Sequence, residues 1–133
     1  MALSIIMLRL EKGLLSSRES SARGSLFPQP RLIVDGKPVL LDDLTGHGWR
    51  LVREGSADGL ADAALPGMQL ITIGDGGWKE ADGVMRAWFQ RHGCSAALVR
   101  PDNYVFGTAD SIAGARALIE EAAAMLGLAA VTH

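Results

Sequence analysis

Apolar and polar positions between residues 49 and 126 follow the two periodicities that distinguish strands from helices. Short runs rich in apolar and β-branched residues predict strands, and apolar positions three or four residues apart predict helices. The expected strands span residues 49–52, 69–73, 95–99 and 104–106, and the expected helices span 57–64, 83–92 and 111–126. Glycine and proline residues separate these runs and mark the turns between them.

From residue 49 onward the predicted order is β-α-β-α-β-β-α. The first strand–helix–strand unit should form a right-handed parallel crossover. The last two strands should form an antiparallel hairpin, because Pro101-Asp102-Asn103 between them has the chemistry of a turn. This succession is typical of the α/β thioredoxin-like fold, in which helices flank a central mixed sheet.

Residues at both ends of the two longer helices favour defined boundaries. Asp82 can accept hydrogen bonds from the first free amides of the helix at 83–92, and Gly93 favours its termination. Ser111 can cap the last helix in the same way, and Gly127 lies just past its end. These residues predict where the two helices begin and end.

A β-hairpin is predicted before this core. Its two expected strands span residues 31–34 and 37–41. Asp35-Gly36 lies between them, where glycine tolerates the positive φ of a tight turn. Pro38 lacks an N–H group and confines its strand to a sheet edge or a strand start. Asp42 and Asp43 follow directly, and we expect them to terminate the strand and cap a turn.

The first 23 residues are predicted to form an amphipathic helical arm and a linker. Apolar residues recur there at helical spacing, namely Leu3, Ile6, Met7, Leu10 and Leu14. The polar stretch 16–24 interrupts this pattern and is interpreted as the linker. A short helix outside a domain needs its apolar face covered, so the arm packs either on its own domain or on a second chain. We therefore divide the chain into residues 1–23 and a thioredoxin-like domain over 24–133.

Composition excludes several classes of function. The chain of 133 residues is long enough for one domain, and its net charge of −2 gives no drive toward nucleic acid or anionic membranes. No apolar run approaches the roughly 20 residues that span a bilayer, and the N-terminal residues lack the basic start of a signal peptide. Because a single cysteine fits a reducing compartment, we expect a cytoplasmic protein that binds neither nucleic acid nor membrane.

Cys94 is the residue that could carry thiol chemistry. A lone cysteine excludes an internal disulfide and a Cys-x-x-Cys pair, and no cysteine lies in residues 53–60, where thioredoxins carry that pair. We expect Cys94 in the loop between a helix and a strand. There it serves either as a small buried apolar residue or as a reactive thiol. The three histidines have no spacing typical of a metal site: His47, His92 and His133.

Three further groups of residues could bind a ligand or carry chemistry. Gly74–Gly77 follows a strand, but it lacks the motifs of dinucleotide and phosphate loops, so we expect an ordinary loop. His47 lies near Asp42 and Asp43, yet no nucleophile elbow accompanies them and no hydrolytic triad is assigned. A pocket for an aromatic compound could form near the three tryptophans, Trp49, Trp78 and Trp88.

Five short stretches occur in an order that resembles one known family. They are Leu26-Phe-Pro-Gln-Pro-Arg31, Leu40-Leu-Asp-Asp-Leu44, Ile73-Gly-Asp75, Met85-Arg-Ala-Trp-Phe89 and Leu98-Val-Arg-Pro-Asp-Asn-Tyr-Val105. Over about residues 24–126 the chain resembles the C-terminal region of FAD-dependent aromatic-ring hydroxylases. The resemblance is to 3-(3-hydroxyphenyl)propionate hydroxylase and its relatives among the phenol-hydroxylase-like monooxygenases.

The resemblance implies a thioredoxin-like domain without redox cysteines. In that family a large N-terminal portion holds FAD and substrate, and that portion lies outside the resemblance. No catalytic, cofactor-binding or metal-binding residue is therefore carried over, and no cofactor is expected in this chain. The implied role is a non-catalytic one in subunit or partner contacts, with a homodimer or a flavoprotein hydroxylase subunit as the assembly. The alternatives are a thiol-dependent enzyme using Cys94 and a module that binds aromatic compounds.

Overall fold

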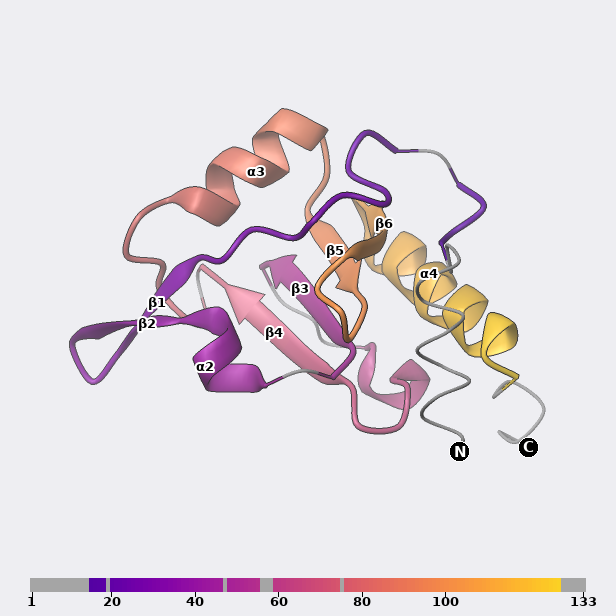
Figure 1. Cartoon of the computed structure of the whole chain (residues 1–133), viewed down its shortest axis with the longest axis horizontal. Coiled ribbons are helices and arrows are strands. Elements are labelled where there is room, and N and C mark those ends of the chain that lie inside the picture. The colour runs from indigo at the N-terminus through magenta and orange to yellow at the C-terminus, as the bar shows by residue number, and fades with distance from the viewer. Residues whose placement is uncertain (1–14, 19, 47, 56–58, 75, 128–133) are drawn as a thin grey trace.

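A four-stranded mixed sheet forms the centre of the protein in the computed structural model, which describes residues 15–18, 20–46, 48–55, 59–74 and 76–127 (Figure 1). The strand order is β4-β3-β5-β6, with β3 parallel to β4 and antiparallel to β5, and β5 antiparallel to β6. The strands are β3 (Arg50–Glu54), β4 (Gln69–Ile73), β5 (Ala96–Val99) and β6 (Val105–Ala109). The predicted parallel pair and the predicted antiparallel hairpin are both confirmed.

Two helices cover opposite faces of this sheet (Figure 1). The helix α4 (Ile112–Met125) packs on the face that carries Leu51 and Leu98. The helix α3 (Val84–His92) packs on the other face, which carries Val52 and Val99. Because side chains alternate along a strand, each strand of the sheet contributes to both hydrophobic clusters. The predicted α/β architecture, a mixed sheet flanked by helices, is confirmed.

The connection from β3 to β4 differs from the prediction. The expected helix over 57–64 is wrong, because the described part of this stretch contains only the 3₁₀ turn η1 (Ala61–Ala63). Gly59 adopts a φ of 89°, which interrupts a right-handed helix at its start. Pro66 disfavours helical backbone at the residue before it. The stretch between these two positions forms only the 3₁₀ turn.

The N-terminal hairpin forms as predicted and protrudes from the sheet (Figure 1). Its strands β1 (Arg31–Val34) and β2 (Lys37–Leu40) pair around Asp35 and Gly36, whose φ angles are 52° and 79°. Two successive positive φ angles are what a tight two-residue hairpin turn requires.

A short helix, α2 (Leu41–Thr45), follows β2 directly. Asp42 and Asp43 lie in its first turn, so the expectation that they end a strand and cap a turn is wrong. The physical reason is Leu41, whose side chain is fully buried, so that the chain turns inward one residue earlier than the strand pattern predicts.

The ends of the long helices are partly as predicted. Ser111 caps α4, because its Oγ accepts a hydrogen bond of 3.0 Å from the amide of Gly114. Gly93 ends α3 with a φ of 63°. The expected cap Asp82 is only a marginal acceptor, at 3.4 Å from the amide of Val84. Glu80 takes the main role instead, as described below.

Residues 15–18 and 20–27, which we call the edge segment, run along the outer side of β6. The amide of Ser16 donates to the carbonyl of Phe106 at 3.0 Å, and the amide of Val105 donates to the carbonyl of Ser25 at 2.8 Å. The stretch interpreted as a linker thus contacts the sheet. The arm residues 3, 6, 7, 10 and 14 lie outside the described residues, so the division at residue 23 stays a prediction.

Candidate functional site

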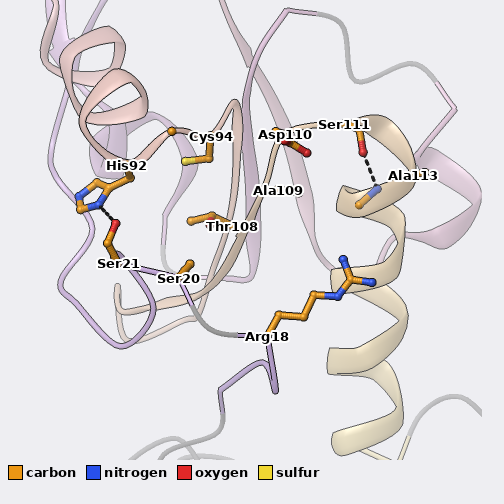
Figure 2. Close-up of a pocket in the computed structure, with 12 residues that line it drawn as sticks. Arg18, Ser20, Ser21, His92, Cys94, Thr108, Ala109, Asp110, Ser111 and Ala113 are labelled. Atoms are coloured by element: carbon orange, nitrogen blue, oxygen red, sulfur yellow. Dashed lines mark hydrogen bonds between the residues drawn. The ribbon is translucent and has the colours of Figure 1, made fainter.

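Cys94 borders an open hollow of about 550 Å³ between α3, β6 and the start of α4 (Figure 2). The edge segment closes one side of it with Arg18, Ser20 and Ser21. Cys94 lies between α3 and β5, as predicted. The hollow therefore combines residues from four parts of the fold that are distant in sequence.

The Cys94 thiol is half-buried and packs against the cluster beneath α3. Burial raises the pKa of this thiol, and a hydrogen bond with the Thr108 side chain offsets only part of that shift. The nearby carboxylate of Asp110 raises the pKa further. Since the thiolate is the nucleophile, this environment favours the unreactive protonated form. The role of Cys94 as a reactive thiol stays a prediction without support from its surroundings.

His92 does not serve Cys94 as a base. Its Nδ1 shares a hydrogen bond with Ser21 Oγ (Figure 2). The His92 ring also packs against that of Trp88, with the ring centroids 4.8 Å apart. His47, the other histidine considered with Asp42 and Asp43, lies outside the described residues. The side chains around the hollow therefore do not form a nucleophile–base pair that includes the thiol.

The two helix N-termini are engaged by the protein itself. At α3 the Glu80 carboxylate accepts a hydrogen bond of 2.6 Å from the amide of Met85 and a longer one from Arg86. Burial raises the pKa of Glu80, and these amides oppose the shift. At α4 the amide of Gly114 is taken by Ser111, beside the acidic Asp110. An anion at α3 would thus compete with Glu80 for these amides, and an anion at α4 would lie beside the carboxylate of Asp110.

The Gly74–Gly77 loop contributes no phosphate cradle. It borders a second hollow of about 470 Å³. The lining of this hollow carries both signs of charge, with two acidic residues, Glu54 and Glu80, and two basic residues, Lys79 and Arg86. The backbone of Gly77 instead lies against Thr72, and the amide of Trp78 donates to the Thr72 carbonyl at 2.9 Å. The loop thus protects the edge of β4.

The three tryptophans do not form a common pocket. Trp49 lies in the cluster beneath α4, whereas Trp88 lies in the cluster on the opposite face of the sheet. Trp78 is 39% exposed beside β4. The expected pocket for an aromatic compound near all three is therefore wrong, because a sheet separates two of them.

A buried arginine, which the sequence did not single out, organises the turn between β5 and β6. Arg50 is fully buried and donates to Asp42 Oδ1 at 2.8 Å. It also donates to the carbonyl of Arg100 and to Asn103 Oδ1, both at 3.1 Å. Arg100 in turn pairs with Asp102. The one signal in the sequence is the position of Arg50 directly before the apolar pair Leu51-Val52 of a predicted strand.

The described residues contain neither a group of side chains suited to a metal ion nor a helix suited to span a membrane. Within those ranges no three His, Cys, Asp or Glu side chains gather in a way that could hold a metal ion. No helix of the described chain is both long and apolar enough to cross a membrane.

The sequence profile of the family described as the HcaD C-terminal domain matches residues 24–124. The chain belongs to this family. This HcaD C-terminal domain is 33% identical over 111 residues to the probable NADH-specific resorcinol 4-hydroxylase of Rhodococcus jostii (strain RHA1). The match covers 74% of the chain but 21% of the relative, so the domain spans about a fifth of that protein.

Solved structures of flavoenzymes share the fold of this HcaD C-terminal domain. The flavin-dependent monooxygenase PieE, in complex with FAD and substrate, matches 85% of the chain with a TM-score of 0.62 and 24% identity. Aklavinone-11 hydroxylase, in complex with FAD and aklavinone, matches 77% with a TM-score of 0.54 and 24% identity. Each match covers 22% of the solved chain. The predicted relation to the C-terminal domain of FAD-dependent aromatic hydroxylases is therefore confirmed.

Proposed function

We propose that this chain acts as the non-catalytic C-terminal domain of an FAD-dependent aromatic-ring hydroxylase, through contacts with the flavin-binding portion. The family match over residues 24–124 carries this proposal. In the relatives about four-fifths of the polypeptide lies outside the matched part, which leaves room there for the flavin and the substrate.

The described residues do not fit FAD, which supports a role apart from the chemistry. A pyrophosphate needs free amides at a helix N-terminus, usually beside a glycine-rich loop. Glu80 takes those amides at α3, and Asp110 stands beside the capped start of α4. A pyrophosphate at either place would meet a carboxylate, so we derive no step of hydroxylation from this chain.

The polar side chains that are most engaged hold the fold together. Arg50 joins β3 to α2 and to the β5–β6 turn, and Glu80 holds the start of α3. Glu121 on α4 binds Ser16 and Ser17 of the edge segment. Such interactions fix a shape, and they occupy the arginine and the two glutamates that take part in them. They suit a domain whose work is to present a surface.

The two other functions gain no support from the described residues. A thiol enzyme needs a thiolate, whereas burial raises the pKa of Cys94. A module for aromatic compounds needs a common aromatic pocket, whereas the sheet separates Trp49 from Trp88.

The proposal is tested by the visible absorbance spectrum of the purified chain after it is mixed with excess FAD and the unbound flavin is removed. We expect no flavin band. A known flavoprotein carried through the same steps is the positive control, because it must keep its band. A stoichiometric flavin retained on this chain would contradict the proposal and would favour a catalytic role instead.

A further inference from the structure

We infer that the arm predicted from the sequence, residues 3–14, packs on its own domain and covers the open end of the hydrophobic cluster beneath α4. The surface that receives the arm lies in the described part of the chain and consists of Met68, Ala123, Met125 and Leu126, which we call the apolar rim. The inference is independent of the proposed function. It rests on the fixed point where the arm joins the domain, on the exposure of the rim beside that point, and on the apolar face of the arm.

The point where the arm joins the domain is fixed beside α4. The amide of Ser16 donates to the carbonyl of Phe106 at 3.0 Å, and the Ser16 hydroxyl donates to the Glu121 carboxylate at 2.5 Å. The amide and the hydroxyl of Ser17 donate to the same carboxylate, at 2.8 and 2.7 Å. Only Leu15 lies between these contacts and the last residue of the arm. The arm therefore joins the domain within one residue of the helix that carries most of the rim.

The apolar rim is a part of this cluster that the described residues leave partly open. Met125 is 39% exposed, and the other three side chains are half-buried against the cluster. Met125 follows Glu121 by four residues, which places it about 6 Å farther along α4. In the opposite direction the side of α4 is taken by Arg18, which lines the hollow together with Ala113 (Figure 2). The rim thus offers uncovered apolar surface within about one helical turn of the junction.

The arm has a length and an apolar face that suit this surface. As a helix, residues 3–14 would span about 18 Å, close to the roughly 21 Å of α4. The apolar residues share one face of such a helix, namely Leu3, Ile6, Met7, Leu10 and Leu14. Lys12 lies on the opposite face. A helix this short is marginal in water by itself, so its stability depends on covering the apolar face.

Covalent attachment favours the chain's own domain over a second copy as the partner of the arm. A surface joined through a short connection is present at an effective concentration in the millimolar range, about a thousandfold above that of a second copy in a micromolar sample. For the same contacts the chain's own rim is therefore preferred. The bonds of Ser16 and Ser17 already restrict the chain at the junction, so a small rim suffices to hold the arm.

Disulfide trapping in the full chain tests this inference. Cys94 is first replaced by Ser, and Met7→Cys is then combined with Met125→Cys. We expect oxidation with copper phenanthroline to join the two cysteines within one chain, which a non-reducing gel and mass spectrometry of the linked peptides detect. Lys12→Cys with Met125→Cys is the matched control. Its yield should be about tenfold lower, because position 12 faces away from the rim and a disulfide needs close Cα atoms.

A mixing experiment separates the two partners of the arm. Chains that carry only Met7→Cys are oxidised together with chains that carry only Met125→Cys, again with Cys94 replaced by Ser. A linked heterodimer would place the arm on a second copy and overturn the inference. Equal yields from positions 7 and 12, or no disulfide from either, would overturn it as well.

A stability measurement decides the matter without introduced cysteines. Ile6→Asp places a charge in the expected contact and should lower the thermal unfolding midpoint at any protein concentration, whereas Lys12→Asp should not. Met125→Asp should lower the midpoint too. The variant with both Ile6→Asp and Met125→Asp should unfold close to Met125→Asp alone, because the two changes disrupt one contact. Additive losses, or an unchanged midpoint for Ile6→Asp, would contradict the inference.

Discussion

Arg50 and Asp42 form an ion pair of 2.8 Å that joins β3 to the short helix α2. The Arg50 side chain is 1% exposed and that of Asp42 is 28% exposed, so only the acid reaches water. Burial lowers the pKa of Arg50, and the charge and hydrogen bond of Asp42 act in the opposite direction. The buried charge is compensated, because each guanidinium nitrogen donates to an oxygen. Nε donates to the Gly48 carbonyl, Nη1 to Asp42 and Nη2 to the Arg100 carbonyl.

Replacing Arg50 should destabilise the protein strongly. Arg50→Met keeps the volume but leaves the carbonyls of Gly48 and Arg100 without their donor, so we expect a loss of about 3 kcal/mol in the free energy of unfolding. Chemical denaturation measures this loss. Arg116→Met is the control, because Arg116 pairs with Asp62 at the surface, where solvent screens the pair, so its loss should change the free energy of unfolding far less. Equal losses in the two variants would contradict the assigned role.

The contact between Glu121 and the edge segment should make stability depend on pH. Burial alone would raise the pKa of Glu121, but hydrogen bonds from Ser16 and Ser17 outweigh it and the pKa lies below its usual value of 4.5. The ionised acid therefore stabilises the fold above pH 4.5, and this contribution disappears as the pH falls through the lowered pKa. Glu121→Gln should lower the thermal unfolding midpoint at pH 7 but have little effect at the acid end.

The neighbouring exposed acid provides the control for that experiment. Glu120→Gln changes the charge of α4 by the same amount without touching Ser16 or Ser17. Its unfolding midpoint should track that of the unmodified chain across the pH range. If both variants shifted alike at pH 7, the effect would come from net charge and the edge segment would have no part in it.

Cys94 should react slowly with thiol reagents in the native protein. Because burial raises the pKa of the thiol, its thiolate fraction at pH 8 is smaller than that of a free cysteine. Alkylation by iodoacetamide should be several-fold slower in buffer than in urea, where the same residue is exposed. Thr108→Val removes a hydrogen bond that lowers the pKa and should slow the reaction further. A native rate equal to the rate in urea would revive the reactive-thiol hypothesis.

A side chain at position 77 should disrupt the loop that covers β4. A Cβ atom there would overlap the carbonyl group of Thr72, which is backbone and cannot rotate away. Gly77→Ala should therefore cost about 3 kcal/mol, at the upper end of the range for overpacking. Gly48→Ala is the matched control, because its Cβ would meet only an ordinary contact of 3.4 Å. Thermal unfolding of both variants checks this, and similar midpoints would argue against the close approach.

Elements with two independent signals in the sequence could be predicted closely. The strand at 69–73 matches β4, because a β-branched run is flanked by glycine-containing turns. The last helix matches α4 because a serine cap, an apolar stripe and a glycine stop agree. Elements with one signal were missed. The helix α2 lacks a side-chain cap, and its first leucine continues an apolar run that reads as a strand.

The candidate site was less predictable because its contacts join distant segments. The position of Cys94 between a helix and a strand follows from periodicity, but the shift of its pKa depends on burial that no local pattern shows. Glu80 caps α3 from five residues away, because the backbone on either side of it is pinned to Arg31 and Ile33 of β1. Trp49 and Trp88 lie on opposite faces of the sheet. Which face each one occupies depends on how whole strands and helices pack, and the positions of aromatic residues in the sequence do not show this.

The edge segment changes where the working boundary of this domain lies. The family match begins at residue 24, yet the bonds from Ser16 to Phe106 and to Glu121 lie upstream of that point. A version cut at residue 24 would leave part of β6 with unpaired backbone groups, which is the usual start of strand-to-strand aggregation. The solubility of the domain therefore depends on residues before position 24, which the family match does not include.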